Sequence, residues 1–383
     1  MKVKILLLLI LLFVQLRTQV NAQILSNSTK ITITKTWSQE PNGWTYPIFI
    51  NVPGGAAPDG GFPVCILLHG NGGNGENILQ AWKNTLNTHV CVAVSGYLKS
   101  WNIDEEKSDA PDVEMMNDLI DSIQTYSNIN PNKIRILGQS NGSALVNRVF
   151  IENKDTGIDI FCAIGSQLNE NQYHDDNFYY PGGETVGSDI YGGYDIISTP
   201  IKGRKYLSVC NTNDPIIPYN GGPSVGVMFL PAETAIFIIA KSQGYTGSQL
   251  TGTLLEDNVH IFSYLSDQVV LLNGDAKHGI NAIQKEYIKN YFNNNHPIVG
   301  LNNFMPAFLE LYPNPCNSTM KVLGSDSELG YKIFNLNGQE IINGITANNT
   351  VNTLELLTAG VYVISFFSND KMILIKKIIK TGL

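Results

Sequence analysis

A serine between two glycines offers the clearest chemistry in this sequence. Residues 138–142 have the form G-x-S-x-G, with Ser140 at the centre. Ile134 and Ile136 precede this motif with the alternation of a strand, and residues 144–149 follow at helical spacing. A sharp strand-to-helix turn between glycines leaves the serine hydroxyl exposed at the carboxyl edge of a sheet. The segment therefore predicts a nucleophile elbow with Ser140 as the nucleophile.

The candidate base is a histidine later in the chain. A serine hydroxyl needs a base to become a good nucleophile, and the base needs an acid that fixes its tautomer. In a sheet of this kind these residues follow in the order serine, acid, histidine. His278 lies between a predicted strand and the last predicted helix, where its ring can reach over the sheet edge. By contrast, His260 falls in an apolar strand and is expected to be packed, and His296 falls in a linker.

Asp214 is the candidate acid. It follows the predicted strand 205–210 and precedes Pro215, so it should lie at the same sheet edge as the serine. An aspartate before proline is also a common turn residue. Asp189 and Asp195, in the long irregular stretch 167–200, are therefore the alternatives.

Acyl transfer also needs hydrogen-bond donors for the oxyanion. One is expected to be the backbone N–H of Asn141, directly after the nucleophile. The other is expected from the loop 69–72, where the N–H of Asn71 is the best-placed candidate. The glycines of that loop allow the backbone to approach a substrate closely.

The same loop also fits a dinucleotide-binding pattern. Gly70, Gly72 and Gly75 match G-x-G-x-x-G after a strand and before a helix. That fingerprint requires an acidic residue about 20 positions on, at the end of the next strand. Residues 90–96 supply none, so the pattern favours a hydrolase over a nicotinamide site, and we expect neither cofactor nor metal.

Alternating strands and helices must position these residues. An edge hairpin is predicted from strands 30–36 and 45–52 around a turn at 41–43, and a further turn at 130–132. Further strands are predicted at 63–68, 90–95, 158–164, 205–210, 260–265 and 268–272, and helices at 76–88, 112–124, 232–242 and 280–292. This order predicts an α/β fold, a doubly wound and mostly parallel sheet.

The two ends of the chain differ from this core. Residues 1–22 have the charged, apolar and small-residue regions of a secretory signal peptide; a retained anchor is the alternative. The catalytic domain is predicted at 23–293 and a linker at 294–308. Residues 309–383 show short strands, at 331–336, 339–342, 351–356, 360–367 and 371–379, and predict a small all-β sandwich.

Charge and cysteine content exclude several functions. The net charge is −8, and it becomes −11 without the basic residues Lys2, Lys4 and Arg17, which argues against nucleic acid or an anionic membrane as partner. The five cysteines form no C-x-x-C pair, so zinc is not indicated. Four of them lie in apolar strands and are expected to be buried, namely Cys65, Cys91, Cys162 and Cys210.

With these residues in place, the core resembles the α/β-hydrolase group that contains polyhydroxybutyrate depolymerases and feruloyl or acetylxylan esterases. The matching segments, in chain order, are 68–73, 129–134, 138–142, 213–222 and His278. The stretch Asp-Pro-x-x-Pro-Tyr-x-Gly-Gly from Asp214 is the most specific of them. The resemblance implies that Ser140, Asp214 and His278 form the triad.

Two departures from this group concern the pocket. Members usually carry a second glycine after the elbow, where this chain has Ser143, and a Trp-Pro pair past the histidine, where it has Ile280 and Asn281. The triad is compatible with both differences. The substrate cannot be carried over from the group.

The tail resembles the C-terminal sorting domain of the type IX secretion system. The matching segments are 311–315, 333–338, 357–362 and 376–380. A carbohydrate-binding sandwich is the alternative, but no row of aromatic residues supports it. Taken together, the sequence predicts a secreted or surface-bound serine esterase that passes through the periplasm. A serine peptidase of the same fold and a non-catalytic binding module are the competing hypotheses.

Overall fold

The computed structural model describes residues 23–104, 106–182, 191–293, 310–323, 328–368 and 371–382. The predicted signal peptide and linker, Asp189 and His296 lie outside these ranges. The described chain divides into two compact units, each treated by itself here. The first comprises residues 23–253 and 259–293, and the second comprises 254–258 and the described residues from 310 onward.

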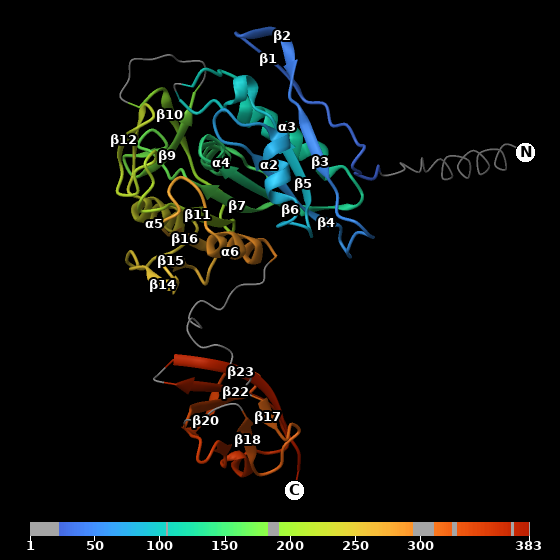
Figure 1. The fold of residues 1–383 in the computed structure, drawn as a ribbon, viewed down its shortest axis with the longest axis vertical. Coiled ribbons are helices and arrows are strands. Elements are labelled where there is room, and N and C mark those ends of the chain that lie inside the picture. Colours follow the sequence, from blue (N-terminus) through green and yellow to red (C-terminus); the bar gives the residue numbers. More distant parts are fainter. Residues whose placement is uncertain are drawn as a thin grey trace, which may run out of the picture. The chain divides into compact units, whose positions relative to one another are not determined.

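The first unit is built on a mixed sheet (Figure 1). Its strands in spatial order are β15 (Val259–Tyr264), β16 (Val269–Asn273), β11 (Lys205–Val209), β7 (Ile158–Ile164), β6 (Ile129–Gln139), β4 (Phe62–Leu68), β5 (Val90–Val94) and β3 (Ile48–Asn51). Neighbours from β16 to β5 are parallel, and β15 and β3 pair antiparallel at the margins. The chain moves from β4 to β5 and then to β6 on the other side of β4, so the direction of winding changes between β4 and β6. Ligands of such sheets bind at this switch point.

Helices cover both faces of the sheet. Consecutive residues of β4 from Val64 to Leu68, which point alternately to the two faces, are accordingly all 0% exposed. The core on one face joins Val64, Ile66 and Leu68 to the apolar sides of α3 (Asp112–Gln124), α4 (Asn141–Glu152) and α5 (Ala232–Ser242). Two further helices lie side by side, since Lys285 Nζ of α6 (Ala282–Phe292) donates to the carbonyl of Ala81 in α2 (Gly75–Trp82) at 3.3 Å. The structure thus confirms the doubly wound α/β-hydrolase architecture.

Several predicted elements of the first unit were wrong. The hairpin pairs β1 (Thr34–Trp37) with β2 (Glu40–Thr45) around residues 38–39, so residues 41–43 belong to a strand. Residues 130–132 likewise lie inside β6, and α2 ends six residues before position 88. The stretch 167–200 contains a three-stranded sheet of β8 (Tyr173–His174), β9 (Asn177–Pro181) and β10 (Tyr194–Ser198). A hairpin of β12 (Gly222–Ser224) and β13 (Val227–Phe229) was not predicted.

Buried cysteines were predicted correctly. Cys65, Cys91, Cys162 and Cys210 are buried, and so is Cys316 of the second unit. All five are free thiols. Within the described ranges, no helix has the length and apolar character needed to cross a bilayer.

The second unit is a β-sandwich, as predicted. One sheet contains β17 (Glu310–Tyr312), β18 (Met320–Leu323) and β21 (Thr350–Val351), and the other contains β20 (Glu340–Ile345), β19 (Gly330–Phe334), β22 (Gly360–Ser368) and β23 (Lys371–Lys380). Side chains from both sheets share one core, in which Met320 and Val351 meet Ile333 and Ile364. The strand expected at 351–356 is wrong, since residues 354–356 form a 3-10 turn.

Candidate active site

The nucleophile elbow lies where β6 ends and α4 begins. Ser140 adopts φ 53° and ψ −120°, a conformation that is costly for a residue with a side chain. The flanking glycines make this turn possible. A Cβ on Gly138 would lie 2.2 Å from the carbonyl oxygen of Gly142, and a Cβ on Gly142 would lie 2.4 Å from that of Leu68. The strand and helix are therefore in backbone contact around the serine.

Replacing Gly142 by alanine should lower the free energy of unfolding by about 3 kcal/mol, because the added methyl group pushes against backbone that cannot move independently. Gly54→Ala is the matched control, since a Cβ there meets nothing within 4 Å. All four tryptophans lie between residues 37 and 101, so urea unfolding followed by their fluorescence reports on the first unit alone. Equal midpoints for the two variants would contradict the close packing.

The structure brings Ser140, His278 and Asp214 together. His278 Nε2 lies 2.8 Å from Ser140 Oγ, and His278 Nδ1 lies 2.8 Å from Asp214 Oδ2. Because an ionised carboxylate only accepts hydrogen bonds, Nδ1 carries the ring hydrogen and Nε2 is free to accept the serine proton. The other oxygen of Asp214 accepts from the N–H groups of Ile216 and Ile217 at 2.8 and 3.0 Å. These bonds fix the carboxylate plane.

Two asparagines that sequence reasoning missed connect the loops of the acid and the base. Asn211 Nδ2 donates to the carbonyls of Lys277 and Gly279 at 2.8 and 2.9 Å. Asn213 accepts from the N–H of Lys277 at 2.8 Å and donates to the carbonyl of Asp275 at 2.7 Å. Their position just before Asp214 was visible in the sequence. Their partners, more than 60 residues away, were not.

The alternative residues lie elsewhere. Asp195 is exposed on β10. His260 is exposed on β15, so its predicted packing was wrong: its alternate neighbours Val259 and Ile261 face the core instead.

The expected oxyanion donors are the backbone N–H groups of Asn71 and Asn141. Neither the N–H of Asn71 nor that of Asn141 donates to an acceptor within the described part of the chain. Asn141 is the first residue of α4, where a helix leaves its N–H groups unpaired. Both residues border the same cavity as Ser140.

The glycine-rich loop after β4 packs on the elbow. A Cβ on Gly70 would lie 3.3 Å from the Cβ of Ser140. His69 is buried, and its Nδ1 bonds the carbonyl of Gly70 at 2.8 Å while its Nε2 accepts from the N–H of Gly96 at 3.0 Å. Because Nε2 accepts a hydrogen bond, it carries no proton and the ring is neutral, and burial lowers the pKa of His69 in the same sense. Gly70 thus allows this loop to approach Ser140 closely.

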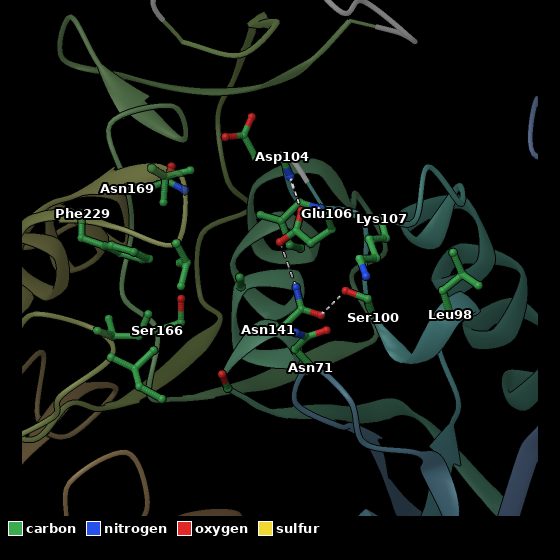
Figure 2. A pocket seen from close by; sticks show the side chains of 17 residues that line it. Asn71, Leu98, Ser100, Asp104, Glu106, Lys107, Asn141, Ser166, Asn169 and Phe229 are labelled. Atoms are coloured by element: carbon green, nitrogen blue, oxygen red, sulfur yellow. Dashed lines mark hydrogen bonds between the residues drawn. The ribbon is translucent and has the colours of Figure 1, made fainter.

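The cavity above Ser140 has a volume of about 440 Å³. Both sides of the cavity carry polar and apolar side chains: Figure 2 shows Ser166 and Asn169 on the side of Phe229, and Leu98 on the side of Ser100. One wall carries Phe229 and comes mainly from the segment 216–229, which adds isoleucine and valine side chains. The facing wall carries Ser100, Glu106 and Lys107 from the loop after β5. A cavity of this size with a mixed polar and apolar lining is typical of a small-molecule site.

A buried carboxylate holds the loop that carries Ser100 and Glu106. Asp112, at the start of α3, is 1% exposed and accepts from Tyr46 Oη at 2.9 Å and from the N–H of Asn102 at 2.8 Å. Burial raises the pKa of Asp112 to about 7.

This pKa predicts a stability profile. The unfolded chain loses the Asp112 proton near pH 4 and the folded chain near pH 7, so the stability of the folded state falls as the pH rises between these values. In Asp112→Asn that contribution disappears, whereas the loss of one hydrogen bond does not depend on pH. The urea midpoint of Asp112→Asn should therefore rise relative to that of the wild type as the pH increases from 4 to 7. Parallel curves would contradict the raised pKa.

Comparison with known proteins assigns the second unit. Residues 310–381 match the family model described as "Secretion system C-terminal sorting domain", which confirms the predicted sorting domain. None of the curated proteins matches this sequence.

Solved structures resemble this chain at low identity. A Bacillus cereus carboxylesterase is 13% identical, with 65% of this chain and 94% of that chain covered and a TM-score of 0.42. An acetyl xylan esterase from Aspergillus awamori is 11% identical, with 64% and 94% covered and a TM-score of 0.45. A phospholipase/carboxylesterase from Dyadobacter fermentans is 12% identical, with 64% and 95% covered and a TM-score of 0.39. Likeness at this level assigns no activity.

Proposed function

We propose that this protein is a secreted serine esterase that hydrolyses carboxylic esters through an acyl-enzyme. The observation that carries the proposal is the chain of two 2.8 Å contacts from Asp214 through His278 to Ser140. Beside it lie the N–H groups of Asn71 and Asn141, which donate to no acceptor among the described residues. The ordered motifs of the sequence support the same roles. Asp214 orients His278, and the N–H groups of Asn71 and Asn141 hold the oxyanion.

The reaction proceeds in two steps, acylation of Ser140 and hydrolysis of the acyl-enzyme. His278 Nε2 takes the proton of Ser140 as Oγ attacks the ester carbonyl, whose oxygen becomes negative between the two N–H donors. When the carbonyl re-forms, the bond to the alcohol oxygen breaks and His278 returns the proton to that oxygen. Water then repeats the attack on the acyl-enzyme, and the acid and free Ser140 are the products.

A fluorophosphonate probe tests this proposal directly. The Ser140 oxygen should displace fluoride from phosphorus and leave one stable adduct per chain, which peptide mass analysis should place on Ser140. A non-catalytic binding module has no activated serine and would remain unlabelled. Absence of labelling in the folded protein would therefore refute the esterase.

We also propose which acids and alcohols form the esters that the protein hydrolyses. The cavity is lined by apolar side chains such as Phe229 and by hydrogen-bonding ones such as Ser100 and Asn169, which favours esters of polar alcohols with an apolar acid, or hydroxyalkanoate esters, over uniformly charged substrates. A panel of feruloyl, acetyl-sugar and hydroxyalkanoate esters should identify the class. A serine peptidase of this fold would instead cleave peptides faster than matched esters.

Export is proposed to use the second unit. The sorting-domain match supports recognition by the type IX secretion machinery after passage through the periplasm. Deleting residues 310–383 in a host with that machinery should retain the esterase inside the cell envelope.

A further inference from the structure

One loop contacts both elements that carry the oxyanion donors. We name residues 96–104 together with Glu106, between β5 and α3, the bridging loop. The carbonyl of Lys99 in this loop accepts from the N–H of Gly72 at 2.8 Å, directly after the donor residue Asn71. On its other side the bridging loop meets the side chain of Asn141, the second donor residue.

The Asn141 side chain bonds both backbone groups of one residue of this loop. Its Oδ1 accepts from the N–H of Trp101 at 2.7 Å, and its Nδ2 donates to the carbonyl of Trp101 at 3.1 Å. Two bonds to a single residue fix the plane of the amide, and with it the first turn of α4. The backbone N–H offered to the oxyanion belongs to this same asparagine.

Trp101 continues the connection to the first donor. Its side chain is 0% exposed, and its indole Nε1 donates to the carbonyl of His69 at 2.7 Å. His69 begins the loop that holds Asn71. A continuous set of contacts therefore runs from Asn141 through Trp101 to the loop of Asn71, and it ties together two donors that lie 70 positions apart in the sequence.

Glu106 determines which way the Asn141 amide points. Its Oε1 accepts from Asn141 Nδ2 at 3.0 Å (Figure 2), and its Oε2 accepts from the N–H groups of Ile103 and Asp104 at 3.0 and 2.7 Å. A carboxylate cannot donate, so it requires the NH₂ side of the amide to face it. That orientation leaves Asn141 Oδ1 for Trp101.

We propose that the Asn141 side chain, oriented by Glu106, is a positioning group that holds the two oxyanion donors in register. This role rests on the proposed esterase and adds to the backbone role of Asn141. A donor displaced by about 1 Å stabilises the transition state poorly while ground-state binding changes little. Loss of the side chain should therefore lower kcat and spare KM.

Asn141 and Glu106 can be replaced singly and together to test this role. Asn141→Ala removes the amide and keeps the backbone N–H, and kcat should fall about 30-fold while KM stays within about threefold. Glu106→Gln places an NH₂ group against the NH₂ group of Asn141, and Asn141→Asp places a carboxylate against that of Glu106. Each substitution should therefore lower kcat as well. When Glu106→Gln and Asn141→Asp are combined, the new amide can donate to the new carboxylate, so kcat should exceed that of Asn141→Asp alone. It should stay below that of the wild type, because the carboxylate at position 141 still faces the carbonyl of Trp101.

Two controls separate positioning from general loosening. Tyr194→Phe removes a different anchor of the bridging loop, the bond from Tyr194 Oη to the carbonyl of Ile103, without touching either donor residue. Its kcat should stay within about threefold of the wild type. Fluorophosphonate labelling of Asn141→Ala should reach the same end point as the wild type at a lower rate, because the probe's phosphoryl oxygen uses the same donors.

The outcomes are distinct. An unchanged kcat in Asn141→Ala, or an equal loss in Tyr194→Phe, would overturn the positioning role and leave the esterase intact. If Asn141→Ala does not fold by tryptophan fluorescence, Glu106→Gln and the double variant decide by the same criteria. A wild-type chain without label or ester hydrolysis would overturn the proposed function itself.

Discussion

Replacing Ser140 by alanine is expected to lower kcat for p-nitrophenyl acetate by about 10⁶-fold, leaving only the weak acceleration that bound donors supply. The reason is that the Ser140 hydroxyl lies 2.8 Å from His278 Nε2, where its proton can be taken as the oxygen attacks. The substitution removes one oxygen atom and should leave the packing of the elbow unchanged. The urea midpoint measured by tryptophan fluorescence should therefore equal that of the wild type. Initial rates at saturating ester give the comparison.

Ser143→Ala is the matched control for this variant. Ser143 lies in the first turn of α4, three residues after Ser140, but its hydroxyl donates to the carbonyl of Ser166 at 3.0 Å. Its removal should change kcat by less than about tenfold. Retained hydrolysis in Ser140→Ala, after exclusion of a contaminating esterase by purification to constant specific activity, would refute the nucleophile.

Replacing Asp214 by asparagine is expected to lower kcat by about 10⁴-fold near neutral pH. Asparagine can still accept from the N–H groups of Ile216 and Ile217 through its oxygen, so the loop should keep its shape. Its NH₂ group would then face His278 Nδ1 and force the ring hydrogen onto Nε2. In that tautomer the ring cannot accept the Ser140 proton.

Asp195→Asn provides the comparison for Asp214, because this exposed aspartate of β10 was the alternative acid that the structure describes. It should retain wild-type kcat. If the two variants were equally active, the acid of the site would lie elsewhere, and Asp189 would be the next residue to replace.

The elbow and its surroundings could be predicted from sequence because their determinants are local. Gly138 and Gly142 flank Ser140 within five residues, and the strand and helix on either side follow from apolar periodicity. For α3 and α5 the periodicity predicted the observed bounds. The chain order of serine, acid and histidine then selected Asp214 and His278, and their catalytic roles stay predictions until they are measured.

Polar stretches were predicted less well. Residues 167–200 lack apolar alternation, yet they form β8, β9 and β10, because each strand there is stabilised by pairing with its neighbours. The turn of the first hairpin shifted from 41–43 to 38–39 for the same kind of reason: the register of β1 with β2 overrides a local Pro-Asn-Gly signal.

By itself, then, the sequence determined the type of sheet, the turn that exposes Ser140 and the order of its possible partners, since these depend on neighbouring residues and on periodic burial. Only the tertiary structure decided which loops lie against each other. The contacts of Asn213 with the His278 loop and of Asn141 with Trp101 join residues 64 and 40 positions apart. Such hydrogen bonds depend on side-chain reach between folded elements, which no local pattern records.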